Sequence, residues 1–359
     1  MQSNKKAYEG QNIFVGIDVH ARQWHVYASP YPGGMRIKPF VMPPDARGLL
    51  THLNDTYPGG TYHSAYEAGF CGFSSHRELV KLGINNIVFN AADIRKTQKD
   101  KLRKSDAVDC KVIWENLGKG DLSAIYTPSE QEESDRELIR GRETVVKDMR
   151  RAKQRTKMFL HKIGIKGPQE LEVASRNWSF SYIDWLSALS ASLSGGYSKK
   201  LSTLVEDVNK LKSQKKSYDL EILHAVKERH AELYTLLQSV PGIGKLVSAK
   251  LCLEIMNFDR FKDPRQLASY IGLVPDWKKS DQTEVVIGTT IRRNSILRTA
   301  LIEAAWVAIK KEPALGAHFN KCRQNGKAPC VAIVSVARKL VNRIFYVIRT
   351  KTKYEVSKD

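Results

Sequence analysis

The sequence has few cysteines, a shortage of acidic residues, and no apolar run long enough to cross a lipid bilayer. Its five cysteines are scattered, with no C-x-x-C pair and no cysteine–histidine ligand spacing. This pattern argues against structural zinc and favours reduced thiols. The polar start shows no signal-peptide pattern, so a cytoplasmic location and no membrane-spanning segment are expected.

The charge balance points to a polyanionic partner. Lysine and arginine number 58 against 38 aspartates and glutamates, which gives a formal net charge of +20. A field of this sign favours nucleic acid, with a membrane surface as the weaker alternative. The length of 359 residues suits two or three domains with ample core.

The run 12–20 (NIFVGIDVH) predicts a buried strand that carries Asp18 near its far end. A buried acid is costly unless a cation neutralises it, so further acids should converge there. Glu67 follows a second strand-like run, and Asp106 and Asp109 share one face of a predicted helix. Four hard oxygen donors suit Mg²⁺, with Mn²⁺ as a possible substitute. His20 is interpreted as a polar strand-end residue rather than a ligand.

The first third of the chain predicts an α/β domain with a mixed sheet. Expected helices cover 44–55 and 73–82, and expected strands cover 12–19, 23–28, 36–41, 61–66 and 84–90. A basic run at 91–104 leads directly into the two helical aspartates. We expect it to follow nucleic-acid phosphates rather than form a merely solvated face; its candidate contacts are Lys99, Lys101, Arg103 and Lys104.

The middle of the chain predicts two long helices, 128–163 and 199–236, with narrow apolar stripes on charged surfaces. This pattern fits either a helical hairpin within one chain or a coiled coil between subunits. Arg150 and Arg151 are candidate nucleic-acid contacts on the first helix. The expected architecture is thus α/β plus all-α, with domains at 1–127, 128–235 and 236–359.

The last third predicts a helix–hairpin–helix around Gly242 and Gly244, in which the backbone before Lys245 approaches a phosphate. A polar connection, 276–290, contains Ser280. It leads to an amphipathic helix at 291–306, and a final helix is expected at 329–349. Basic residues at the start of the 291–306 helix are further candidate contacts: Arg292, Arg293 and Arg298.

Taken together, these motifs resemble the DEDD transposases of the insertion-sequence "one-ten" family, which are related to Piv-type DNA invertases. The resemblance rests on Gly16-Ile-Asp18-Val-His, Tyr66-Glu67-Ala68, Lys104-Ser-Asp106-Ala-Val-Asp109, Val240-Pro-Gly-Ile-Gly244, Leu267-Ala-Ser-Tyr-Ile-Gly-Leu-Val-Pro275 and Asn294-Ser-Ile-Leu-Arg298. It implies an RNase H-like (RuvC-type) domain whose catalytic acids are Asp18, Glu67, Asp106 and Asp109, followed by a C-terminal transposase domain that supplies a serine nucleophile.

The resemblance places that serine five residues beyond Pro275, at Ser280. The chain departs from the family pattern here, because Lys279-Ser280-Asp281 replaces Ser-Ser-Gly and Arg293 replaces a glycine. Ser295 is the nearest alternative, although a capping or packing role suits it better. The resemblance further implies a covalent phosphoserine, double-stranded donor and target DNA, a structured guide RNA, and a dimer or tetramer near the nucleoid of a bacterium or archaeon.

Two other functions remain open from the residues alone. In a RuvC-like nuclease the four acids would activate water, and Ser280 would only contact phosphate. In a non-catalytic nucleic-acid-binding protein the acids would be turn or cap residues.

Overall fold

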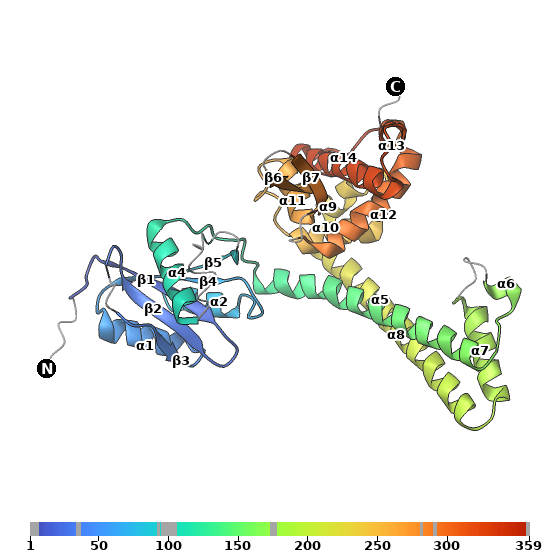
Figure 1. The fold of residues 1–359 in the computed structure, drawn as a ribbon, viewed down its shortest axis with the longest axis horizontal. Coiled ribbons are helices and arrows are strands. Elements are labelled where there is room, and N and C mark those ends of the chain that lie inside the picture. The colour runs from blue at the N-terminus through green and yellow to red at the C-terminus, as the bar shows by residue number, and fades with distance from the viewer. Residues whose placement is uncertain are drawn as a thin grey trace. The chain divides into compact units, whose positions relative to one another are not determined.

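The computed structural model describes residues 7–33, 37–91, 94, 106–172, 178–280, 283–289 and 293–356. The chain divides into two compact units, Met1–Pro128 and Ser129–Asp359, whose elements are labelled in Figure 1. Within the described ranges, no helix has both the length and the apolar character needed to cross a membrane.

The first unit is built on a five-stranded sheet in the order β3-β2-β1-β4-β5. The strands are β1 (Asn12–Val19), β2 (Trp24–Pro30), β3 (Phe40–Met42), β4 (Thr61–Glu67) and β5 (Asn85–Phe89). β2 runs antiparallel to β1 and β3, whereas β4 is parallel to both β1 and β5. The predicted mixed α/β sheet is therefore confirmed, although β3 is shorter than expected.

Helices cover both faces of this sheet (Figure 1). On one face, α1 (Ala46–Thr56) and α2 (Ser74–Lys81) pack against the alternate β1 side chains Ile13, Val15 and Ile17. On the other face lies α4 (Asp106–Lys119), whose Cys110 and Trp114 pack against Tyr27 of β2. The side-chain alternation of β1 thus separates an apolar face from the face that carries Gly16 and Asp18.

Gly16 lets α4 lie directly on β1. A Cβ atom built at Gly16 would lie 2.0 Å from the Cys110 carbonyl oxygen and 2.5 Å from the Trp114 backbone nitrogen. Those are backbone atoms of α4, so a larger residue cannot be accommodated by a side-chain rotation. The glycine therefore determines how closely the first turns of α4 approach the strand.

The second unit begins with a long antiparallel helical hairpin made by α5 (Glu130–Lys162) and α8 (Gly195–Arg229). Ser129 starts α5 with a capping box that includes Glu132. At the hairpin's far end, α6 (Gln169–Glu172) and α7 (Phe180–Ser192) connect the two helices. The second helix predicted at 199–236 is interrupted at His230, where non-helical backbone separates α8 from α9 (Ala231–Leu237).

Ion pairs set the register of the hairpin. The Nε of Arg142 donates to Asp219 Oδ1 at 2.6 Å, and Arg229 Nε donates to Asp135 Oδ2 at 2.6 Å. Arg142 also contacts Glu143, and Lys215 contacts the second oxygen of Asp219 at 2.6 Å. Burial raises the pKa of Asp219, but hydrogen bonds from Arg142 and Lys215 outweigh burial and hold that pKa below its ordinary value.

Replacing Arg142 with methionine should destabilise the second unit by about 2 kcal/mol at neutral pH, because it strips a buried cation from Asp219. A carboxylate with a lowered folded-state pKa stabilises the fold above its unfolded pKa, and this contribution is lost as pH falls through the folded value. The deficit measured by urea unfolding should therefore stay constant down to about pH 5 and shrink as pH falls further, through the unfolded-state pKa and then the lower folded-state pKa. Arg151→Met is the matched control, since its side chain is 72% exposed. A deficit that does not change with pH would contradict this reading.

The C-terminal helices enclose the largest apolar core of the chain. They are α9, α10 (Lys245–Ile255), α11 (Pro264–Ile271), α12 (Ser295–Lys311), α13 (Pro313–Gln324) and α14 (Pro329–Thr350). α12 begins later than predicted because Asn294 accepts a hydrogen bond from Leu297 N and so serves as the N-cap. The final helix lies as predicted, whereas α13 was not anticipated.

The predicted polar connection at 276–290 was wrong. Strands β6 (Pro275–Ser280) and β7 (Thr283–Thr289) form an antiparallel pair in which Ser280 is in register with Thr283. The β7 sequence TEVVIGT is rich in β-branched residues, which favour extended backbone. The adjoining lysines, serine and aspartate gave the segment the composition of a loop.

Candidate active site

Asp18 and Glu67 lie side by side near the C-terminal ends of the neighbouring strands β1 and β4. We call this end of the sheet the acid-bearing edge. Ile17 of β1 is in register with Tyr66 of the parallel strand β4, so the next residues along both strands are Asp18 and Glu67. Residues in register on neighbouring strands point to the same face. Gly16, two residues before Asp18, faces α4, and therefore both acids lie on the α4 side.

Asp109 reaches the same side from the first turn of α4. It immediately precedes Cys110, whose carbonyl oxygen approaches Gly16. Burial, the negative charge of Asp18 and, to a smaller degree, that of Asp109 raise the pKa of the Cys110 thiol to about 12. Both aspartates thus influence one buried thiol, which stays protonated and is not a nucleophile.

His20 contacts the first of these acids. Its Nε2 lies 3.2 Å from Asp18 Oδ2, and the Asp18 side chain is 24% exposed. The ring of His25 on β2 meets that of His20 edge-on at 5.6 Å. The prediction of His20 as a polar strand-end residue missed this contact. Its i, i+2 spacing from Asp18 would have indicated a shared face.

The donor chemistry of this edge fits a hard divalent cation, because every candidate ligand is a carboxylate. Within the described ranges, no three histidine, cysteine, aspartate or glutamate side chains are close enough to hold one metal ion. Glu67 is exposed, and the Asp106 side chain lies outside the described residues. The structure brings Asp18 and Glu67 together with Asp109 nearby, and the complete predicted set stays a prediction.

Ser280 is the last residue of β6, in the second unit, and its side chain is not among those described. Ser295, the alternative, is the exposed first residue of α12. The capping role expected of Ser295 belongs instead to its neighbour Asn294, so that part of the prediction was wrong.

A buried acid holds the elements on either side of the β6–β7 hairpin together. Glu254 of α10 is 1% exposed and accepts hydrogen bonds from Asn294 Nδ2 at 2.7 Å and Arg140 Nε at 3.4 Å. Arg298 donates to the carbonyl oxygen of Gly272, which ends α11. Burial and the nearby Arg293 lower the pKa of Arg298. Asn294 and Arg298 of the family-like motif therefore have clear structural roles, which sequence reasoning did not identify.

The other predicted nucleic-acid contacts are placed as follows. Arg150 and Arg151 are exposed on α5, and Arg151 pairs with Asp148 at 3.1 Å. Gly242 has a φ of 86°, and a Cβ there would lie 2.4 Å from the Ala304 carbonyl oxygen, so its close approach is to α12. Gly244 and Lys245 are exposed at the start of α10. Residues outside the described ranges are Lys99, Lys101, Arg103, Lys104 and Arg292.

Two family models match this chain. A DEDD transposase model of the IS110 type matches residues 15–165, and a model described as the transposase IS116/IS110/IS902 family matches residues 234–320. The first match covers the sheet with Asp18, Glu67 and Asp109, and the second covers the Ser280 region.

Curated relatives extend over most of the chain. It is 26% identical to the transposase y4qE of Sinorhizobium fredii over 309 residues, which are 79% of this chain and 74% of the relative. It is 25% identical to the transposase for insertion sequence element IS1533 of Leptospira borgpetersenii over 303 residues, 81% and 83% of the two chains. A pilin gene-inverting protein of Moraxella bovis is 30% identical over 125 residues, 34% and 38% of the two chains. The chain belongs to the IS110 family of DEDD transposases.

Proposed function

We propose that this transposase cuts and rejoins the DNA of an insertion sequence through a covalent bond between Ser280 and a DNA phosphate. The observation that supports the proposal best is the placement of Asp18, Glu67 and Asp109 on the α4 side of one sheet edge. The family match, which includes relatives named as transposases and as a gene-inverting protein, supports DNA as the substrate.

In this proposal Asp18, Glu67, Asp106 and Asp109 hold Mg²⁺, or Mn²⁺ in its place. The bound cation would neutralise the non-bridging oxygens of the scissile phosphate. Around it, His20 restrains the Asp18 carboxylate through the 3.2 Å contact. The Gly16 contact holds α4, and with it Asp109, against β1.

The reaction exchanges one phosphoester for another. Ser280 Oγ bonds to phosphorus as the bond to a sugar oxygen breaks, and that oxygen leaves with a proton as a hydroxyl. In the second step a hydroxyl of another strand attacks the phosphoserine, and Ser280 is released with its proton restored. The number of phosphoester bonds is unchanged, so no nucleotide triphosphate is needed.

Assembly and further partners complete the proposal. Because Ser280 and the acids belong to different units, the serine can come from the same chain or from another subunit of a dimer or tetramer. The exposed arginines of α5 and the start of α10 at Gly244 and Lys245 support contacts with nucleic acid, including a helix–hairpin–helix contact and an element-encoded guide RNA. A coiled coil between the α5–α8 hairpins of two subunits belongs to the same proposal.

Replacing Ser280 with alanine should abolish a protein–DNA adduct that survives denaturation, because alanine has no oxygen to bond to phosphorus. The measurement is end-labelled DNA incubated with full-length protein and Mg²⁺, followed by a denaturing gel. Ser295→Ala, a matched loss of one hydroxyl near the same hairpin, should keep the adduct. An adduct that persists in Ser280→Ala and disappears in Ser295→Ala would move the nucleophile to Ser295.

A hydrolytic nuclease is the second candidate, favoured by one observation: all four acids belong to the first unit, which does not contain Ser280. In that case Ser280→Ala would still cleave DNA and leave free 5′-phosphate ends. A non-catalytic binding protein would show neither cleavage nor any effect of Mg²⁺ on thermal stability.

A further inference from the structure

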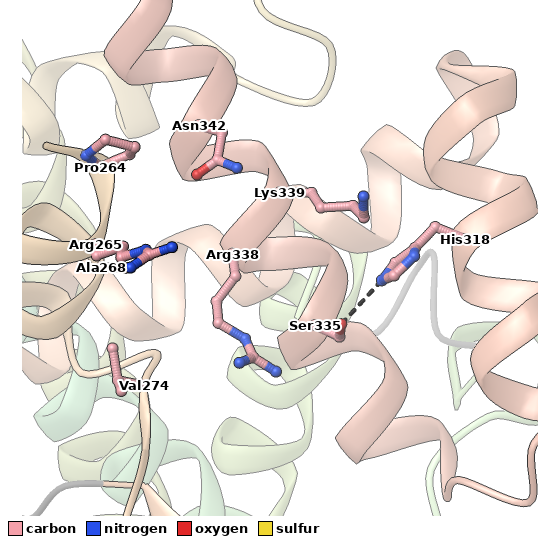
Figure 2. A pocket seen from close by; sticks show the side chains of 9 residues that line it. All are labelled: Pro264, Arg265, Ala268, Val274, His318, Ser335, Arg338, Lys339 and Asn342. Carbon is pink, nitrogen blue, oxygen red and sulfur yellow. Dashed lines mark hydrogen bonds between the residues drawn. The ribbon is translucent and has the colours of Figure 1, made fainter.

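A cavity of about 410 Å³ lies among α11, α13 and α14 of the second unit. Figure 2 shows its lining: Arg265 enters from α11, His318 from α13, and Ser335, Arg338 and Lys339 from α14. Arg338 and Lys339 follow Ser335 by three and four residues, and Asn342 follows them by four and three, so these α14 residues share one helical face. None of them belongs to the acid-bearing edge or to the β6–β7 hairpin.

The cavity is lined by cationic side chains, and no acidic side chain in the lining neutralises them. Arg265, Arg338 and Lys339 line it together with His318, and no aspartate or glutamate is among the lining residues. The Arg338 Nε is buried and has no hydrogen-bond partner within the described part of the chain. That nitrogen is closed to solvent, so an anionic oxygen in the cavity would instead accept from the outer N–H groups of the Arg338 guanidinium, beside Lys339 and Arg265.

The same excess of positive charge affects the pKa of His318. Its Nε2 lies 2.9 Å from Ser335 Oγ, as the dashed line in Figure 2 marks, and 3.7 Å from Cys322 Sγ. Burial, followed by the charges of Lys339, Lys327, Arg338 and Lys321, lowers the pKa of His318. The imidazole is therefore neutral near neutral pH, and the surrounding cations repel a further proton.

The rest of the lining suits a sugar next to an anion. Pro264, Ala268 and Val274 contribute apolar surface beside the arginines. Val274 immediately precedes Pro275, the first residue of the strand that ends at Ser280. A polynucleotide strand whose phosphate sits on Arg338 would thus lie at the base of the hairpin that carries the proposed nucleophile.

We propose that this pocket binds a backbone phosphate of a polynucleotide strand, with Arg338, Lys339 and Arg265 as its cationic contacts and Ser335 as a hydroxyl partner. This inference rests on the proposed function only for the identity of the anion, a nucleic-acid phosphate. The pocket residues belong to the second unit and the four acids to the first. Phosphate contacts of this type position a strand and carry no sequence information.

The test is the affinity of full-length protein for duplex DNA, single-stranded DNA and a hairpin RNA of matched length, measured in EDTA over a series of salt concentrations. Lys339→Gln is the first variant, because this exposed side chain can change without loss of packing. It should weaken binding of at least one polymer and lower the slope of log K against log salt by about 1. Arg338→Gln should do the same, with thermal unfolding as the check on folding.

Lys310→Gln is the matched control, since it removes the same charge from an exposed position of the same unit outside the pocket. Slopes and affinities that match this control for all three polymers would overturn the proposal. The polymer whose binding changes identifies the strand as DNA or RNA. EDTA prevents metal-dependent cleavage, so this assay measures binding alone. Its outcome can therefore be interpreted even if the Ser280 experiment fails.

A second readout follows His318 directly. The His318 imidazole NMR signal of the full chain is assigned by its loss in His318→Gln. The pKa of His318 measured from this signal should rise when an oligonucleotide is bound, because a phosphate would offset the positive charge of the adjacent cations. A titration unchanged by a saturating oligonucleotide would place the strand elsewhere and contradict the proposal.

Discussion

Replacing Asp18 with asparagine is expected to slow DNA strand cleavage by about 1,000-fold or more. The transition state would lose the stabilisation that the bound metal ion gives to its negative charge, which raises the activation free energy by several kcal/mol. Asparagine keeps the size of the side chain and an oxygen that can still accept from His20 at the observed 3.2 Å site. The substitution therefore removes the charge with little change in packing. Cleavage of labelled DNA under single-turnover conditions with Mg²⁺ is the measurement.

Two controls separate this effect from misfolding and from loss of binding. Asp121→Asn changes an exposed acid beyond the end of α4 and should cleave at the wild-type rate. DNA affinity in EDTA should be the same in Asp18→Asn as in the wild type, because the substrate's phosphates are held by cationic residues. If Asp18→Asn cleaved within a few-fold of the wild type, the acids of this edge would not be the catalytic set.

Replacing Gly16 with alanine is expected to destabilise the first unit by about 3 kcal/mol or more. The added methyl group would overpack against backbone atoms, which cannot move aside as a side chain can, so the loss of stability is among the largest for core substitutions. The added Cβ would stand 2.0 Å from the Cys110 carbonyl oxygen and 2.5 Å from the Trp114 nitrogen. Relief requires α4 to move away from β1, which also shifts Asp109 relative to Asp18. The variant should therefore lose both stability and cleavage.

Urea unfolding followed by circular dichroism, with intrinsic tryptophan fluorescence in parallel, measures the stability change. Gly69→Ala is the matched control in the same unit, because a Cβ there meets nothing closer than 3.8 Å. It should stay within about 0.5 kcal/mol of the wild type, as surface substitutions usually do. A Gly16→Ala protein as stable as this control would show that α4 does not rest on the strand as described.

The acidic edge was predictable because its signals are local. Short apolar runs rich in β-branched and aromatic residues predict the strands, and an i, i+3 spacing places Asp106 and Asp109 on one helical face. The parallel pairing of β1 with β4 then places Asp18 beside Glu67. The contact of Gly16 with α4 was not predictable, because no local pattern specifies which helix lies above a given strand residue.

Features that join distant segments were missed for the same reason. Arg142 and Asp219 are 77 residues apart, and the pocket unites Arg265, His318 and Arg338 from three helices. Each of these residues reads as an ordinary surface charge in the sequence. The β6–β7 hairpin was missed because polar residues adjoining Ser280 masked the strand preference of β7.

The most direct test of the central claim is to map the covalent adduct by mass spectrometry. Full-length protein is incubated with labelled DNA and Mg²⁺, digested with protease and nuclease, and searched for a peptide that carries a phosphonucleotide. We expect the modification on Ser280 in the wild type, and none in EDTA or in Asp18→Asn. Mg²⁺-dependent cleavage with unmodified Ser280 and free 5′-phosphate ends would contradict it.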